Sequence, residues 1–564
     1  MPIRNLLLAL ALSAAVAAPT FAAGGDPPPG PAPVADGAPA DRSSWILEEE
    51  IDVEAEAPDE NLIERESDGA TRTRTPLVET PQSIQVLNRR LLEEQQVRTL
   101  DQALVNVSGV VPSRPEELVL QQPLVRGFAS EIFIDGLQAF GLTPVVDPTS
   151  TINVERIEVL KGPSSGLFGG GVGAPLGGLI NIVSKRPLDE ARYGVELRLG
   201  EFETRGAAFD LNVPTGPRSA FRVTGEVEDS ESYIDAVEQQ KYAFFPTFAT
   251  RLGDRTRLTM RAQVSRVENL EYVGLPASIA VAGDFSVDPD RFSGATDAPL
   301  TVIENQLLTA RLDHRFRPGL DGVLEARYYN SSFEEFSTFP FFAFFPPDPD
   351  EPTRFAILSG QLPTDVEQRT LSSRVEWSFG AGETRHRLLA GVELDRTDYD
   401  AATGFNFSPI GVLDYADRGA DLQFGEIPPL TSFFDDTFDT LAVYVQDQIS
   451  FGPVRLLAGL RATRLRVEQR PNLDETYDEL TPRLGLSVDL GVGVAAFAGY
   501  SEGFRGVLFF QGPEGSSPVP ESSEHTEVGF KWSRADLEGS VALYELVRSN
   551  VPAPDPRSPF VQVQ

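Results

Sequence analysis

The sequence contains no cysteine and few of the residues on which metal and nucleophile chemistry most often depends. Without cysteine it has no disulfide, no thiolate metal site and no cysteine nucleophile. Only three histidines are present, His314, His386 and His525, and none lies in an HExxH pattern. After the N-terminus no segment reaches about 18 uninterrupted apolar residues, so no membrane-spanning helix is predicted. The net charge of −36 argues against nucleic-acid binding.

Residues 1–23 have the pattern of an export signal peptide. Arg4 supplies the positive end, Leu6 to Ala18 form an apolar core, and Ala22 and Ala23 suit a cleavage site. The core is well short of the roughly 20 residues that a spanning helix needs. An exported chain without a membrane helix is periplasmic, secreted or an outer-membrane barrel.

Residues 24–74 have the composition of a disordered linker. Residues 24–45 are rich in proline, glycine and alanine, and residues 48–68 hold eleven acids against one arginine. Within the acidic stretch lies an alternating hexapeptide: Glu50, Ile51, Asp52, Val53, Glu54 and Ala55. It is either a solvated charge run or a strand that adds to the sheet edge of a partner.

Residues 75–190 are predicted to form a small α/β domain. We expect a strand at Ser83 to Leu87, a helix at Asn88 to Gln96, and a second helix that opens with a capping box of Thr99 and Gln102. Further strands are expected at 119–126, 132–135, 156–160 and 179–184, with a tight turn at Asp135-Gly136.

A glycine-dense loop separates the last two of these strands. Eight of the 17 residues from Gly162 to Gly178 are glycine. This density predicts backbone conformations closed to other residues, or a close approach to another surface. Gly162 to Gly166 also matches G-x-S-x-G, with Ser164 as the nucleophile, and Gly169 to Ala174 matches G-x-G-x-x-A. Both motifs require a following helix, whereas a glycine- and proline-rich loop follows here.

From residue 191 to residue 564 the sequence consists of short alternating segments. Leu371, Val375, Trp377 and Phe379, for example, share one face of such a segment. About fifteen segments of roughly ten residues fit the strands of an outer-membrane barrel, with a soluble β-sandwich or solenoid as the alternative. Short turns (216–217, 253–254, 380–383) alternate with long polar loops (269–305, 337–366, 401–435). We therefore expect a mainly β protein: a large antiparallel transmembrane β-barrel with an α/β domain before it.

An odd number of strands does not suit a single-chain bacterial barrel. The sequence ends after a loop, without an aromatic terminal residue. Since an unclosed barrel leaves strand edges in lipid, we expect the barrel to be incomplete at its C-terminus and not to assemble stably.

Two features are candidates for ligand binding. Arg126-Gly127-Phe128 offers a donor fork for an anionic or oxygen-rich ligand, or is a charged strand end with a satisfied partner. Seven phenylalanines fall between 333 and 345. An interfacial girdle takes only the first one or two, so the rest predict an aromatic binding patch.

The order of the motifs resembles that of the TonB-dependent outer-membrane receptors, in particular the ferric-siderophore, ferrichrome-type branch. The matching stretches are TPLVETPQSIQV (75–86), VRGF (125–128), FIDGL (133–137), ERIEVLKGPSSGLFG to NIVSKRP (155–187), VYVQDQISF (443–451), LAGLR (457–461), TPRLGLSV (481–488), YSEGFR (500–505) and TEVGFKW (526–532).

This resemblance implies a plug inside a 22-stranded barrel, with the hexapeptide Glu50 to Ala55 as the TonB box. A ferric siderophore binds above the plug, and TonB with its inner-membrane energising complex pulls the plug to release the ligand inward. The implied localisation is the Gram-negative outer membrane. The implied partners are the siderophore, TonB and outer-membrane lipid, and the protein is expected to be a monomeric transporter and not an enzyme. No cofactor and no metal ligand of the protein are expected, because the chelator fills the coordination shell of the iron.

The resemblance also implies a set of ligand-facing residues. Arg126 is the arginine of the RGF motif, and Tyr272 and the run from Phe339 to Phe345 correspond to pocket aromatics of the outer loops. The complete expected set is Arg126, Gln138, Phe140, Tyr272, Phe339, Phe341, Phe342, Phe344 and Phe345. At Asp147-Pro148-Thr149 the chain lacks a tyrosine that many relatives carry, which leaves the identity of the siderophore open.

Three other functions fit parts of the sequence. The same gating serves importers of cobalamin, a saccharide or haem. A passive channel or adhesin on a barrel scaffold needs no energy and no hexapeptide, and an exported esterase needs Ser164 as its nucleophile.

Overall fold

The computed structural model describes residues 62–113, 122–139, 150–169, 171–276, 279, 287–340, 345, 348, 350–417, 422–470, 473–507, 512–513, 516–534, 537–555 and 557–564. The chain divides into two units, of which the second, Val53–Gln564, contains all of these residues. The hexapeptide Glu50 to Ala55, the signal peptide and most of the linker lie outside the described residues. No helix among the described residues is long and apolar enough to cross a membrane.

The first part of this unit is a small α/β domain, which we call the plug. A two-stranded sheet, β1-β2, precedes a five-stranded sheet of order β3-β9-β10-β7-β8 and a three-stranded sheet of order β4-β5-β6. The strands are β1 (Glu66–Ser67), β2 (Thr75–Pro76), β3 (Ile84–Asn88), β4 (Val110–Val111), β5 (Leu124–Val125), β6 (Phe128–Ala129), β7 (Glu131–Ile134), β8 (Leu137–Gln138), β9 (Val154–Lys161) and β10 (Gly178–Ser184), and the helices are α2 (Arg89–Glu94) and α3 (Leu100–Leu104).

Both helices pack on the central sheet through apolar side chains. Leu92 of α2 and Leu104 of α3 are buried in one cluster with Ile157 of β9 and Ile180 of β10. Helix α2 begins where the Asn88 side chain accepts a hydrogen bond from the Leu91 backbone N–H. The capping box predicted for α3 is wrong in part, because Thr99 makes no side-chain cap and Gln102 accepts instead from the Arg98 backbone N–H.

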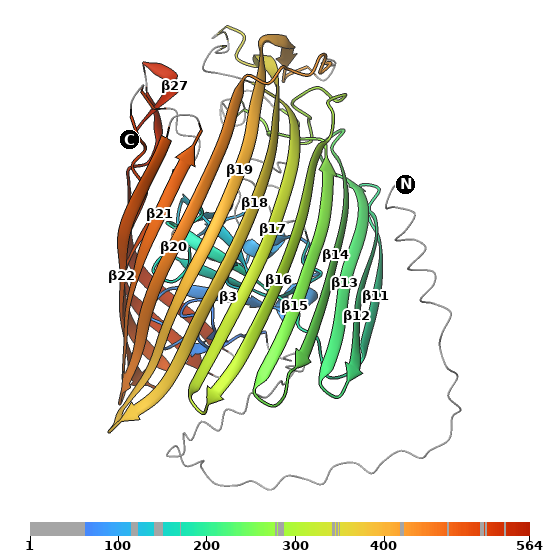
Figure 1. Ribbon diagram of the computed structural model, residues 1–564. Helices are drawn as coiled ribbons and strands as arrows, with labels where there is room; N and C mark the ends of the chain where they lie inside the picture. The colour runs from blue at the N-terminus through green and yellow to red at the C-terminus, as the bar shows by residue number, and fades with distance from the viewer. Residues whose placement is uncertain are drawn as a thin grey trace, which may run out of the picture. The chain divides into compact units, whose positions relative to one another are not determined.

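The second part, as far as the structure describes it, is a single antiparallel sheet of fifteen strands, in sequence order from β11 to β25. We call it the barrel wall; Figure 1 shows it curving around the plug strands, which are drawn in blue and teal. Its strands are β11 (Arg192–Leu199), β12 (Arg205–Gly216), β13 (Ser219–Glu231), β14 (Glu238–Arg251), β15 (Thr256–Asn269), β16 (Thr301–Arg317), β17 (Leu320–Pro340), β18 (Arg354–Ala381), β19 (Thr384–Asp414), β20 (Ser432–Phe451), β21 (Val454–Gln469), β22 (Leu473–Gly491), β23 (Val494–Arg505), β24 (Glu521–Arg534) and β25 (Leu537–Ser549). A small hairpin of β26 (Ala553–Asp555) and β27 (Ser558–Val563) follows.

The two ends of the wall differ as predicted. Short turns join β12 to β13, β14 to β15 and β18 to β19, whereas longer connections join β15 to β16, β17 to β18 and β19 to β20 (Figure 1). We call these the turn side and the loop side. The predicted loops 337–366 and 401–435 are too long, because β17 runs to Pro340, β18 begins at Arg354 and β19 continues to Asp414. Strong cross-strand pairing thus extends these strands on the loop side.

Alternation along each strand separates an inner from an outer face. On β18, β19 and β20 the leucines Leu371, Leu394 and Leu441 are each about 45% exposed (44%, 45% and 44%). Their neighbours Thr370 and Thr440 are buried on the inner face. The predicted mainly β fold, a β wall with a small α/β domain, is therefore confirmed.

Candidate functional site

The inner face of the barrel wall holds the plug through buried charged side chains. Arg126 lies between β5 and β6 in a left-handed conformation (φ 54°), and its backbone N–H donates to the Gly109 carbonyl at 2.8 Å. The guanidinium donates to Glu527 Oε1 at 2.5 Å, contacts His525 Nε2 at 2.8 Å, and stacks 3.8 Å from the Tyr544 ring centre. Its side chain is only 5% exposed. Arg126 therefore fastens the plug to β24 and β25.

Glu527 connects a second plug segment to the same point. The backbone N–H of Ser83 donates to Glu527 Oε2 at 3.0 Å, and the Ser83 hydroxyl donates to Glu527 Oε1. Nearby, Lys161 of β9 donates to the Ser108 hydroxyl at 2.9 Å. Burial and the neighbouring Arg126 lower the pKa of Lys161 to about 8. One carboxylate thus holds the segment that leads into β3 as well as the β5-β6 turn.

A second charged cluster lies where β7 meets β23, β24 and β25. Glu131 accepts from Arg505 at 2.9 Å, and Arg505 also donates to Glu521 at 3.1 Å. Arg548 pairs with Glu521 as well and lies 5.4 Å from the Phe128 ring centre. Burial raises the pKa of Glu131 to about 7, although Arg505 and Arg548 act to lower it.

A third cluster ties the N-terminal part of the plug to β19, β20 and β21. Arg72 donates to Glu393 at 3.2 Å and to the Tyr444 hydroxyl at 2.8 Å, while Arg461 donates to Glu393 at 2.8 Å. The side chains of Arg72 and Arg461 are 5% and 0% exposed. Arg72 also lies 4.6 Å from the Phe168 ring centre. Glu393 is the shared acceptor of two buried guanidinium groups.

Three further cations of the wall bind plug carbonyl groups. Lys531 donates to the carbonyls of Leu77, Thr80 and Gln82 at 2.8, 2.7 and 2.7 Å. Arg483 binds the Ala70 carbonyl at 2.5 Å, and Arg327 binds those of Leu137 and Ile134 at 3.0 and 2.8 Å. These contacts give donors to plug carbonyls that are buried against the wall.

The glycine-dense loop lies against the wall as the sequence predicts. A Cβ added at Gly162, whose φ is 96°, would stand 2.7 Å from the His525 ring, and one at Gly171 would stand 2.7 Å from Thr440 Oγ1. The residues after Ser164 form a turn and not a helix, so the geometry of a nucleophile elbow is missing there.

A charged group inside the plug lies close to its N-terminal strand. Arg156 of β9 pairs with Asp68 at 2.7 Å and with Glu158 at 2.9 Å. The Asp68 side chain is 47% exposed. Partial desolvation acts to raise its pKa, but the positive charges of Arg156, Arg186 and Arg311 lower that pKa to about 2. The Ser67 hydroxyl donates to Glu158 at 2.8 Å. The segment around β1, which contains some of the last residues of the stretch predicted as a linker, is thus held by charge as well as by β1-β2 pairing.

The structure does not gather the predicted ligand residues into one described site. Arg126 is paired with Glu527, as expected if it is a charged strand end with a satisfied partner. Its contact with a ligand stays a prediction. Tyr272 is 7% exposed and packs 5.9 Å from Phe292 in a loop cluster. Gln138 ends β8 and Phe339 lies edge-on to Phe405 at 5.9 Å, both half-buried. Phe345 is half-buried, and Phe140, Phe341, Phe342 and Phe344 lie outside the described residues.

Sequence reasoning missed the wall residues that hold the plug. Glu527 and Lys531 lie in the TEVGFKW motif, but the motif gave no sign that they contact the plug. Glu393 lies in none of the matching motifs. Two aromatic contacts on the loop side were also missed: Phe336 with Phe424 at 6.3 Å and Phe355 with Tyr415 at 5.4 Å. Among the described residues, no group of three or more His, Asp or Glu side chains could hold a metal ion.

A small domain held by charged contacts inside an antiparallel β wall defines the class of plugged β-barrels. The family model "TonB dependent receptor-like, beta-barrel" matches residues 243–564 of this chain. A second family model, "TonB-dependent Receptor Plug Domain", matches residues 76–174. The chain belongs to the TonB-dependent receptor family. It is therefore a protein of the Gram-negative outer membrane, in a family of transporters and receptors.

Several known proteins are similar over most of the chain. A ferrioxamine B receptor of Salmonella typhimurium (strain SL1344) is 26% identical over 519 residues, which cover 87% of this chain and 71% of that protein. The ferrichrome outer membrane transporter/phage receptor of Escherichia coli (strain K12) is 26% identical over 557 residues, covering 90% and 72%. The pyoverdine receptor FpvA of Pseudomonas aeruginosa PAO1 has the same fold, with a TM-score of 0.78 at 19% identity over 89% of this chain and 75% of that one.

Proposed function

We propose that this protein imports a ferric siderophore across the outer membrane by energy-coupled gating of its plug. The observation that carries the proposal is its similarity to a ferrioxamine and a ferrichrome receptor along most of the chain. Iron enters as the chelate, so the protein needs no cofactor of its own. It acts as a monomer in outer-membrane lipid and catalyses no reaction.

The contacts between plug and wall suit such gating. Among the described residues, ion pairs and carbonyl contacts around Glu527, Glu393 and Lys531 help to fix the plug in the wall. Once the plug moves, water can replace each of these contacts, because the groups on both sides are polar or charged. In this proposal TonB binds the hexapeptide Glu50 to Ala55 by strand addition and pulls the N-terminal part of the plug.

A binding titration tests the choice of ligand. The purified protein in detergent is titrated with ferric hydroxamate, catecholate and carboxylate chelates and with cobalamin, while tryptophan fluorescence is followed. We expect saturable quenching by one class of iron chelate. Quenching by cobalamin alone would overturn the siderophore proposal and leave the family assignment intact.

A matched pair of variants separates binding from gating. If Arg126 contacts the ligand, Arg126→Gln weakens chelate affinity, whereas Arg505→Gln, which removes a different plug-to-wall contact, does not. If Arg126 serves only to hold the plug, both variants keep their affinity and change uptake. Deletion of residues 50–55 should abolish uptake and preserve binding; uptake that survives this deletion would favour a passive channel.

A further inference from the structure

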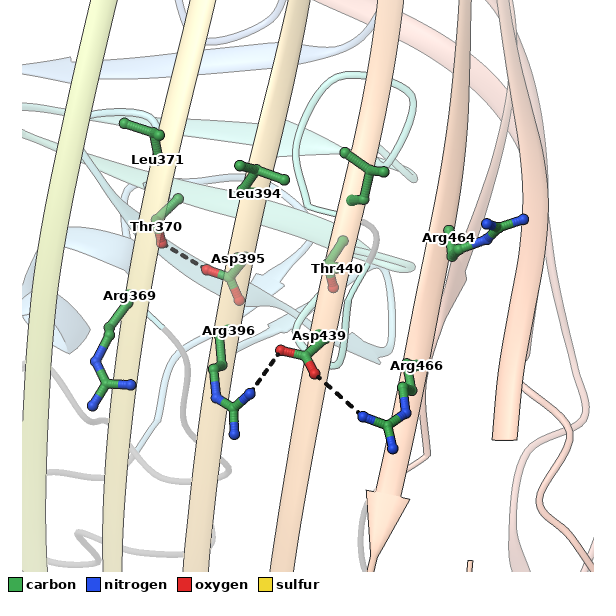
Figure 2. Close-up of a pocket in the computed structure, with 11 residues that line it drawn as sticks. Arg369, Thr370, Leu371, Leu394, Asp395, Arg396, Asp439, Thr440, Arg464 and Arg466 are labelled. Carbon is green, nitrogen blue, oxygen red and sulfur yellow. Dashed lines mark hydrogen bonds and ion pairs between the residues drawn. The ribbon is translucent and has the colours of Figure 1, made fainter. Parts of the chain in front are cut away.

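An arginine without an ion-pair partner lies between the plug and the barrel wall. Arg186 follows β10 and precedes β11, and it is exposed. Its backbone carbonyl accepts from Arg222 at 2.8 Å, but within the described part of the chain its guanidinium makes no ion pair. Arginines on the outer face of the wall differ: Arg396 and Arg466 share the carboxylate of Asp439, at 3.3 and 4.0 Å (dashed in Figure 2).

Three more guanidinium groups lie close enough to Arg186 for their charges to act on it. Partial desolvation, Arg261 and Arg311 lower the pKa of Arg186 to about 10, which still leaves it protonated at neutral pH. Arg156 acts in the same direction, and Asp68 is the carboxylate that opposes these effects most strongly. We call Arg156, Arg186, Arg261 and Arg311 the lumen arginines.

The two lumen arginines that belong to the wall lie on its inner face. Arg311 of β16 shares a face with Leu307, which is buried, whereas Leu308 is 50% exposed on the outer face. Arg261 of β15 pairs with Asp135 of the plug at 3.4 Å, and its side chain is 9% exposed. Its Nε is buried and has no hydrogen-bond partner among the described residues. The cluster therefore faces the plug and retains an unused donor.

The carboxylate of Asp68 occupies the centre of this cluster. Arg156 donates to Asp68 Oδ1 at 2.7 Å, and the charges of Arg186 and Arg311 also favour the ionised form of Asp68. Nevertheless the Asp68 side chain is 47% exposed, so it is not enclosed by protein on every side. One plug carboxylate, still in contact with water, thus serves three guanidinium groups.

Asp68 lies on a part of the plug that can leave without disturbing the arginines. It follows β1, which pairs with β2 through two residues only. Withdrawal of this segment breaks the contact of Asp68 with Arg156 and the 2.8 Å hydrogen bond from Ser67 to Glu158. The lumen arginines stay in place, because β9 belongs to the central sheet of the plug and β15 and β16 belong to the wall.

We propose that the lumen arginines form a binding site for a carboxylate-bearing ferric chelate, and that Asp68 occupies this site until the segment around β1 is withdrawn. The occupant in the structure is itself a carboxylate, and guanidinium groups bind carboxylates through paired N–H donors. The choice of a ferric chelate as the ligand rests on the proposed function. The affinity of the site for carboxylates does not.

The charge balance of the cluster favours an anionic chelate over a neutral one. After Asp68 leaves, three lumen arginines keep a carboxylate partner, namely Glu158, Asp135 and Asp313, at 2.9, 3.4 and 2.8 Å. Arg186 then has no carboxylate to offset the neighbouring guanidinium groups. A carboxylate of the chelate can neutralise this excess of positive charge, whereas an uncharged chelate leaves it in place.

The test measures citrate binding by the full chain, purified in detergent, with isothermal titration calorimetry at low ionic strength. Asp68→Ala empties the site without removing an arginine, and we expect it to bind citrate at least about tenfold more tightly than the wild type. Asp68→Ala combined with Arg186→Gln should lose this gain. Added salt should weaken the binding, because it screens the charges.

Glu66→Ala is the matched control. It removes a carboxylate two residues earlier in the same segment, but the partner of Glu66 is Arg74, which is 66% exposed and is not a lumen arginine. This variant should bind citrate like the wild type. Thermal unfolding checks that each variant is folded. Asp68→Asn keeps the shape of the side chain without its charge and should show a smaller gain in citrate affinity.

Three results would each overturn the proposal: no gain in citrate affinity in either Asp68 variant, an equal gain in Glu66→Ala, or a gain that survives Arg186→Gln. Citrate binding requires no transport and no iron. If every iron chelate failed to quench the tryptophan fluorescence, the proposed function would fall, while tighter citrate binding by Asp68→Ala would still establish the carboxylate site. Normal chelate uptake without that gain would overturn the site alone.

Discussion

The core of the plug and its boundary with the barrel wall bury different kinds of side chain. Around α2, α3 and the central sheet the plug buries an apolar cluster that includes Leu104, Ile157 and Ile180. At the boundary the wall contributes Leu389 and Tyr444 to a second apolar cluster, but much of the contact is made by ion pairs and carbonyl contacts.

This difference bears on how the plug can move. Apolar burial is non-directional and stabilises in proportion to the area removed from water. A buried ion pair gains little net free energy, because the loss of hydration offsets much of the attraction between the charges. The plug can therefore be stable in itself, while its attachment to the wall contributes only a small net free energy. The proposed gating requires this property of the plug.

The strongest test of the comparison removes the shared acceptor at the boundary. Glu393→Ala leaves the guanidinium groups of Arg72 and Arg461 buried without their carboxylate. Because an unpaired buried charge is costly, we expect a loss of about 4 kcal/mol in the free energy of unfolding, measured by denaturant titration. Glu393→Gln keeps an acceptor and should lose less. An unchanged midpoint in Glu393→Ala would mean that water already solvates this boundary.

The matching change in the core is Leu104→Ala. Leu104 is fully buried, so the truncation leaves a cavity and should cost about 3 kcal/mol. Unlike the loss in Glu393→Ala, this loss should not depend on salt concentration. Val105→Ala, one position along and 70% exposed, should change the unfolding midpoint little. If Leu104→Ala lowers the free energy of unfolding no more than Val105→Ala, this apolar cluster does not stabilise the plug.

The sequence predicted the strands of the wall better than its contacts with the plug. Alternation of apolar and polar residues is local, so about fifteen strands and the short turns at 216–217 and 253–254 could be predicted. The extended pairing of β17, β18 and β19 on the loop side could not be predicted. No local sequence signal distinguishes a strand that continues past the apolar band from a polar loop.

The candidate site depended on contacts between distant segments. The RGF motif alone identified Arg126 as a candidate. Its partners Glu527 and His525 lie 401 and 399 residues further along the chain. Periodicity shows only which face of a strand these residues occupy, and not which part of the plug they meet. The glycine-dense loop was the exception, since its composition alone predicted a close approach to another surface.

Glu131 offers a test of the boundary through pH. Burial raises its pKa to about 7 from an ordinary value of 4.5, so the folded protein retains a proton that the unfolded chain releases. The stabilising contribution is complete below the ordinary pKa and is lost as the pH rises toward 7. From about pH 5 to about pH 8 the wild type should lose about 1 to 3 kcal/mol relative to Glu131→Gln. Parallel pH profiles of the two proteins would show that Glu131 is already ionised beside Arg505.

The smallest effect is expected at an ion pair that belongs to the plug but is exposed. Arg74, which directly precedes β2, pairs with Glu66 of β1 at 2.5 Å, and their side chains are 66% and 39% exposed. Water and salt screen this pair, and ordering two long side chains offsets most of its attraction. Arg74→Gln should therefore change the free energy of unfolding by less than about 0.5 kcal/mol, measured in the same denaturant titration as Glu393→Ala. Glu393→Ala removes the acceptor of two buried guanidinium groups, whereas Arg74→Gln removes one partner of a single exposed pair, so the contrast reports burial together with the number of pairs lost. A loss in Arg74→Gln as large as that in Glu393→Ala would show that β1-β2 is itself an anchor, and that the segment nearest the linker must unfold before the boundary yields.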